Sequence, residues 1–183
     1  MHNLSPLRVY DFVEGRRPTR RLTTIAFLSA VGIALFVVES YIPMPLPFLK
    51  IGLANISSVI ALMILDTTSM LTVVVLRVVV GSLFVGTFMS PAFVLALSAG
   101  VVSAAVMAIV KAISKNFFSA LGLSLIGSIT HVVVQLLIVR FVYVQNAAVL
   151  QLLPLLLLTA LIGGLIVGLI SVRLLSALKQ VRI

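Results

Sequence analysis

Six polar or charged side chains lie within or beside long apolar stretches of this sequence, and their types are suited to binding a ligand. A charge at the centre of a bilayer costs about 2.5–3.5 kcal/mol on insertion scales, so each such side chain needs a partner, water or a function. The set combines cations, amides, an imidazole and one carboxylate, which together suit a small anionic or amphipathic molecule. Its members are Glu39, Lys50, Asn55, Arg77, His131 and Gln135.

Arg77 lies about nine residues into an apolar stretch, which places it near the bilayer centre. Gly81, one turn further along the same helix, is expected to leave space beside it. The guanidinium could bind an anion, or it could form an ion pair with Glu39, the only acid at the outer end of a predicted span. The two interpretations are compatible.

His131 and Gln135 are four residues apart, so they lie on one face of a helix, and Gly127 extends that face by one turn. A lone histidine in a membrane helix is more often an interhelical hydrogen-bonding residue than a ligand contact. The neighbouring Gln135, and Arg77 at a similar depth, favour a shared pocket.

Three alternating prolines at 43–47 fix the backbone as a stiff, non-helical segment before the chain returns to the membrane. This segment could be a lid or a rigid connector. Lys50, Gly52 and Asn55 follow it with a cation, a flexible backbone point and an amide. Irregular backbone at membrane depth persists only where protein or a wet cavity covers it.

Membrane-spanning helices must position these side chains. Apolar residues make up 62% of the 183 residues and charged residues 9%, with a mean hydropathy of +1.32, whereas a soluble domain carries about a quarter charged residues. We predict an all-α polytopic membrane protein with spans at 22–41, 54–66, 68–88, 91–111, 119–142 and 152–173. The short second span must tilt, begin inside the preceding loop, or be shielded by its neighbours.

Ten of the thirteen lysines and arginines precede the first span, join the fourth span to the fifth, or follow the sixth. The positive-inside rule therefore places both termini in the cytoplasm, in a multi-pass protein of the cytoplasmic (inner) cell membrane. We predict a basic cytosolic tail over 1–20 that can rest on membrane lipid, a six-helix domain over 21–175, and a short basic tail over 176–183. The net charge of +9 is thus explained without a nucleic-acid partner.

The residues that several classes of enzyme require are missing from the sequence. It has no cysteine, no glycine followed by lysine as a phosphate-binding loop needs, and no aspartate cluster of the kind that holds magnesium in prenyl-diphosphate chemistry. Its two histidines, His2 and His131, lie at different predicted depths, so a histidine metal site or a Ser-His-Asp arrangement lacks partners. We predict no catalytic residue, no metal and no cofactor.

Small residues recur every four positions in the first span, at Ala26, Ala30 and Ala34. Such a stripe permits close contact between helices, either inside the bundle or with another protein. The same alternatives apply to Gly164 and Gly168 in the sixth span.

The sequence also resembles a known family, the Gx transporter family, also labelled heptaprenyl diphosphate synthase component I, from about Leu22 to Ser171. The residues that carry the resemblance are Glu39, Pro43, Pro47, the box Lys50-Ile-Gly-Leu-Ala-Asn55, Leu76-Arg77, Gly86, Gly100, Gly122-Leu-Ser-Leu-Ile-Gly127, His131-x-x-x-Gln135, Leu153-Pro154 and Gly163.

That family is similar in turn to the substrate-binding S components of energy-coupling factor transporters. The resemblance implies six helices with cytoplasmic termini and an outward-facing pocket covered by the first loop. It also implies that the stripe at Ala26, Ala30 and Ala34 meets a transmembrane coupling protein that works with ATPase subunits.

We therefore expect a membrane subunit that captures a small molecule from the outer side, with Glu39 orienting Arg77 or Lys50. If the chain acts alone, it is a secondary transporter in which Glu39 or His131 carries the proton. A different class of function is a non-catalytic membrane partner of a prenyl diphosphate synthase or of a membrane redox assembly, which would need no polar pocket.

Overall fold

The described part of the chain is built from helices alone. The computed structural model describes residues 18–42, 52–114 and 117–180, and no strand occurs in these ranges. The six α-helices are α1 (Pro18–Ser40), α2 (Asn55–Ile64), α3 (Thr67–Val85), α4 (Pro91–Ile113), α5 (Ala120–Ile138) and α6 (Leu153–Gln180). The predicted all-α class is confirmed.

The helices begin where short polar side chains can cap them. Asp66 accepts a hydrogen bond from the Ser69 N–H at the start of α3 (2.7 Å), and Ser90 and Ser119 cap α4 and α5 in the same way. Such caps satisfy backbone donors that the first helical turn leaves without partners. Gly86 ends α3 with φ +74°, a conformation that glycine adopts without strain. The helix boundaries therefore lie near these residues, where the sequence predicts breaks between spans.

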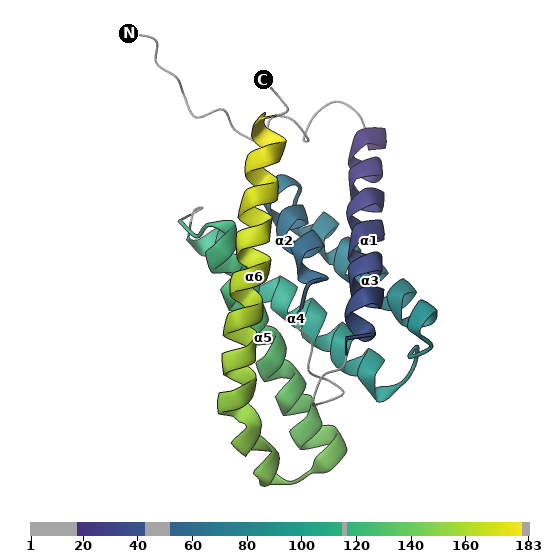
Figure 1. Cartoon of the computed structure of the whole chain (residues 1–183), viewed down its shortest axis with the longest axis vertical. Coiled ribbons are helices and arrows are strands. Elements are labelled where there is room, and N and C mark those ends of the chain that lie inside the picture. Colours follow the sequence, from purple (N-terminus) through teal and green to yellow (C-terminus); the bar gives the residue numbers. More distant parts are fainter. Residues whose placement is uncertain (1–17, 43–51, 115–116, 181–183) are drawn as a thin grey trace.

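Five of the six α-helices are long and apolar enough to cross a membrane, within the part of the chain that the structure describes. Many of their apolar side chains face outward, as expected of lipid-facing helices; examples are Leu83, Phe84, Leu158 and Leu169. The chain is a multi-pass membrane protein. The start of α1 and the end of α6 lie at the same end of the molecule, called here the terminal end (Figure 1).

The second helix differs from the other five. With ten residues, α2 is about 15 Å long, roughly half the thickness of the hydrocarbon core. Its residues 56–62 are all buried, and it contacts α1, α3, α5 and α6. Of the three explanations for its short apolar stretch, shielding by neighbouring helices agrees with this burial. Lipid therefore does not surround α2 as it surrounds a full span.

Helices α5 and α6 make a close, extended contact in which glycines allow the backbones to approach. A Cβ atom added to Gly168 would lie 2.9 Å from the Cα of Leu121. The Ser124 hydroxyl donates a hydrogen bond across the same contact to the carbonyl oxygen of Gly164 (2.9 Å). The glycines of α6 thus face the protein's own bundle, whereas Ala26, Ala30 and Ala34 on α1 are all exposed.

Beyond Ile138, α5 continues as a wider π-helix over Val139–Val144, followed by a turn at Gln145 (φ +51°) and a 3₁₀-helix over Ala147–Leu152. This connection lies at the end of the molecule opposite the terminal end (Figure 1). The sequence predicts regular spans at 119–142 and 152–173 and does not predict these irregular helical turns. Helix α6 also runs through Gln180, into the segment predicted as a C-terminal tail.

A polar cluster joins α1 to the turn between α2 and α3. Arg21 forms an ion pair with Asp66 (Nη2 to Oδ2, 2.6 Å), and its guanidinium also donates two hydrogen bonds to the Ser69 hydroxyl (3.0 and 3.2 Å). Both ionic side chains are about half exposed, so solvent weakens their attraction.

Two substitutions at Asp66 separate its ionic role from its capping role. Asp66→Asn removes the ion pair and keeps a capping oxygen, so we expect a loss of at most about 1 kcal/mol in the free energy of unfolding. Asp66→Ala also removes the cap and should cost about 1 kcal/mol more. Unfolding of the purified chain in mixed micelles measures both. Equal losses for the two variants would show that the cap contributes nothing.

Candidate functional site

One cavity brings together five of the six residues that the sequence predicts as ligand-binding. Glu39 comes from α1, Asn55 from α2, Arg77 from α3, and His131 and Gln135 from α5. The cavity measures about 40 Å³ and is partly open. The sixth predicted residue, Lys50, and the proline segment lie outside the described residues. Four helices therefore contribute a polar side chain to one site.

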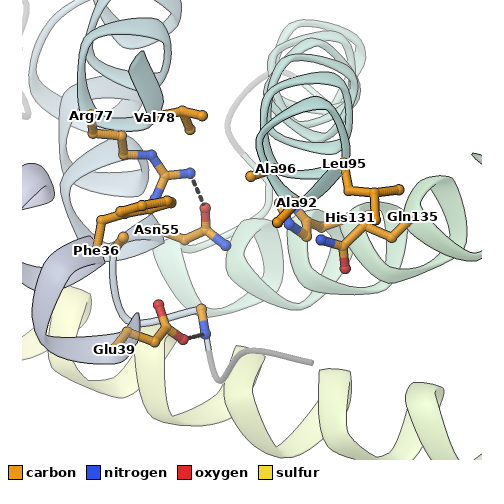
Figure 2. A pocket seen from close by; sticks show the side chains of 12 residues that line it. Phe36, Glu39, Asn55, Arg77, Val78, Ala92, Leu95, Ala96, His131 and Gln135 are labelled. Carbon is orange, nitrogen blue, oxygen red and sulfur yellow. Dashed lines mark hydrogen bonds between the residues drawn. The ribbon is translucent and has the colours of Figure 1, made fainter. Parts of the chain in front are cut away.

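Arg77 is the most unusual side chain of the site. It is only 4% exposed, and its Nη2 atom donates a hydrogen bond to the Asn55 Oδ1 atom (2.5 Å; Figure 2). Its Nε atom is buried and has no hydrogen-bond partner among the described residues. A buried guanidinium has five donors to satisfy, so this one retains capacity to bind an anion.

Glu39 is 3% exposed and holds the backbone where the chain enters α2. One oxygen of its carboxylate, Oε1, accepts hydrogen bonds from the N–H groups of Gly52 and Leu53. The direct ion pair with Arg77 considered from the sequence is not formed, because the described residues contain no such contact within 4 Å. Glu39 thus orients the turn that leads directly into α2 and Asn55.

His131 and Gln135 line the cavity from the side opposite Arg77 and Glu39 (Figure 2). Their spacing puts both on one face of α5, as the sequence predicts. Small side chains of α4, Ala92 and Ala96, line the space between the two groups. The cavity therefore has one side with Arg77 and Glu39 and another with His131 and Gln135, and apolar walls formed by Phe36, Val78 and Leu95.

Gly81 plays a different role from the one that the sequence suggests, and Gly127 borders another hollow. Gly81 does not leave room for Arg77, because a Cβ atom there would lie 2.6 Å from the ring of Phe36. Gly127 does not line this cavity. It contacts Met107 and borders a second hollow of about 10 Å³, which Asn55, Ser124 and Ser128 also line. Asn55 thus lies between the two hollows.

The space beside Arg77 comes from Gly32 on α1, which sequence reasoning missed. A Cβ atom at Gly32 would lie 3.3 Å from two carbons of the Arg77 side chain and 2.5 Å from the Ser57 hydroxyl. Phe36, one turn along α1, was also missed and forms a wall of the cavity. The spacing of Gly32 and Phe36 at i and i+4 was the available signal, since such residues share a helix face.

A double substitution tests the role of Gly32. Gly32→Ala should lower the stability by about 1–3 kcal/mol, because neither Ser57 nor the stem of Arg77 can move away freely. Adding Ser57→Ala removes the closest contact and should recover part of that loss, although Ser57→Ala alone costs about 1 kcal/mol through its bond to the Ala54 carbonyl. Thermal unfolding of the two single variants and the double variant gives the coupling free energy between positions 32 and 57. Losses of stability that add strictly would contradict this packing.

The site contains groups suited to binding a ligand. Across residues 18–42, 52–114 and 117–180, no three His, Cys, Asp or Glu side chains gather as metal ligands. The described residues that line the cavity supply one guanidinium, one carboxylate, one imidazole and two carboxamides. These groups can hold a charged head group in a defined orientation.

Comparison with known protein families gives a match to heptaprenyl diphosphate synthase component I over residues 28–174. The chain belongs to this family. The resemblance stated from the sequence is thereby confirmed. Comparisons with curated proteins and with solved structures gave no match.

The match to heptaprenyl diphosphate synthase component I covers all five described residues of the predicted set that line the cavity. Together with the long apolar helices, it identifies the chain as a membrane component. The cavity lies within the part of the chain that defines the family.

Proposed function

We propose that this member of the heptaprenyl diphosphate synthase component I family is a substrate-binding subunit of a membrane transporter. It captures a small anionic or amphipathic molecule from the outer side of the membrane. The observation that carries the proposal is the cavity in which Glu39, Asn55, Arg77, His131 and Gln135 meet. A polar residue that only joins two helices by a hydrogen bond explains one such side chain. It does not explain five polar side chains from four helices in one cavity.

The anionic part of the ligand binds Arg77. This guanidinium is buried, lines the cavity and has an unused Nε donor. Asn55 holds the Nη2 edge and so fixes the plane of the group. A positioned guanidinium binds carboxylate or phosphate more strongly than it binds a neutral acceptor.

Transport requires energy from a partner, because the sequence has no phosphate-binding loop. The exposed stripe at Ala26, Ala30 and Ala34 is the surface we propose for a transmembrane coupling protein with ATPase subunits. In this arrangement the protein is multi-pass in the cytoplasmic membrane with both termini in the cytoplasm. Uptake by vesicles that contain this chain alone would instead assign a secondary transporter.

Native mass spectrometry of gently extracted protein tests the proposal, since it reports the ligand mass and the bound subunits together. We expect a small molecule on the unmodified chain and none on the double variant Arg77→Ala, His131→Ala. The matched control is Arg173→Ala, which removes an exposed arginine at the terminal end of α6. Equal binding to the unmodified chain and the double variant would contradict ligand capture at this cavity.

A second candidate function follows from the family description, which names a component of a heptaprenyl diphosphate synthase. The chain would then be a non-catalytic membrane partner of that synthase, and its cavity would have no ligand to hold. Co-purification with a soluble synthase, together with unchanged function after His131→Leu and Gln135→Leu, would favour this role over transport.

A further inference from the structure

Two opposite charges line the same cavity without contacting each other. Glu39 is 3% exposed and Arg77 is 4% exposed, and both side chains line the hollow. No ion pair joins them among the described residues, although they lie in the same pocket. Removing two charges from water without letting them meet is unfavourable, since neither gains the full attraction of the other.

Each of the two groups keeps unused hydrogen-bonding capacity. Arg77 uses Nη2 on Asn55, and its Nε has no partner in the described part of the chain. Glu39 uses Oε1 on the backbone of Gly52 and Leu53, and its second oxygen accepts no hydrogen bond from the described residues. Among the described residues that line it, the cavity thus offers one cationic donor, Arg77, and one anionic acceptor, Glu39, to a ligand.

We infer, on the basis of the proposed function, that the ligand is a small zwitterion whose anionic group pairs with Arg77 and whose ammonium group pairs with Glu39. A ligand with an anionic group alone would place a second negative charge beside the buried Glu39, and Arg77, the one cation among the described lining residues, does not offset both. A ligand with a cationic group alone would place a second positive charge beside the buried Arg77. Only a ligand with both charges complements both walls.

The size of the cavity and the two polar side chains on its far side narrow the class of ligand further. A hollow of about 40 Å³ encloses only a few atoms, so the charged head must be compact. His131 and Gln135 stand opposite the charged pair and can bind a neutral polar group where the ligand has one (Figure 2). Amino acids with a polar side chain have all three groups, and short ω-amino acids have the two charges alone.

A matched set of three compounds tests the inference on the unmodified chain, so no variant needs to fold. The compounds are 4-aminobutanoate, butanoate and butylamine, which share a carbon chain and differ in charge. Thermal stabilisation of the purified full chain in detergent gives the concentration for half-maximal effect. We expect 4-aminobutanoate to bind at least about 30-fold more tightly than either singly charged compound, because each of those leaves one buried charge without a partner.

Chain length then reports the separation of the two charges. Glycine, β-alanine, 4-aminobutanoate and 5-aminopentanoate move the ammonium group stepwise away from the carboxylate. One member of this series should bind best, and the preference should be lost in Glu39→Gln. A series in which all members bind equally would contradict a two-point contact.

Two variants assign the two charges to their partners. In Glu39→Gln, affinity for 4-aminobutanoate should fall at least about 30-fold while that for butanoate does not fall; in Arg77→Gln, affinity for both should fall. Asp66→Asn is the control, since it neutralises an acid outside the cavity. Unfolding without ligand verifies that each variant is folded.

The outcomes separate this inference from the proposed function. Butanoate binding as tightly as 4-aminobutanoate would overturn the zwitterion and leave anion capture by Arg77 in place. If none of the compounds binds and native mass spectrometry finds no ligand, both the zwitterion and substrate capture are wrong.

Discussion

Replacing Arg77 with lysine is expected to weaken ligand capture strongly even though the positive charge is retained. Lysine presents a point charge and cannot both hold Asn55 through one edge and offer a second donor to a ligand. We expect the affinity for the co-purifying molecule to fall at least about 30-fold, which corresponds to about 2 kcal/mol. The measurement is ligand occupancy by native mass spectrometry at increasing ligand concentration.

The control for this substitution is Arg173→Lys, an equivalent change at an exposed position of α6. It should leave occupancy unchanged. An Arg77→Lys variant that binds within about threefold of the unmodified chain would show that charge alone suffices, because such a change corresponds to less than about 1 kcal/mol.

Replacing Gly168 with alanine is expected to give the second large effect, on stability. The added Cβ atom would lie 2.9 Å from the Cα atom of Leu121 and 3.3 Å from the Cβ atom of Ser124. Because the nearest atom is backbone, α5 and α6 must move apart, and overpacking of this kind costs about 1–3 kcal/mol. Unfolding of the purified chain in mixed micelles measures the loss.

Leu169→Ala, at the next residue along α6, is the matched control because its side chain is exposed on the outer surface. It should change the stability much less than Gly168→Ala does. Equal effects at the two positions would mean that the α5–α6 contact is not limited by the glycine.

The helices of this protein are largely predictable because their boundaries depend on local chemistry. Asp66, Ser90 and Ser119 cap the helices that follow them, and each capping interaction spans three residues of sequence. The burial of α2 is not predictable in this way. Its residues are as apolar as those of a lipid-facing helix, so hydropathy does not distinguish protein neighbours from lipid.

The depth of the site residues is predictable, whereas their contacts are not. Counting along a helix puts Arg77 and His131 at similar depth, and both do line one cavity. Which side chain each helix presents to its neighbour depends on rotation about the helix axis. For that reason Asn55 is the hydrogen-bond partner of Arg77, where Glu39 seemed the natural choice from charge alone.

The wide turn at Val139–Val144 has a consequence for how this chain compares with its relatives. A π-helical turn holds one residue more than an α-helical turn over the same rise. A relative one residue shorter at this point can close the segment as a regular helix without disturbing His131 or Gln135, since both precede it. We therefore expect length differences among family members to fall there, so that an alignment of their last two helices places its gap within these six residues.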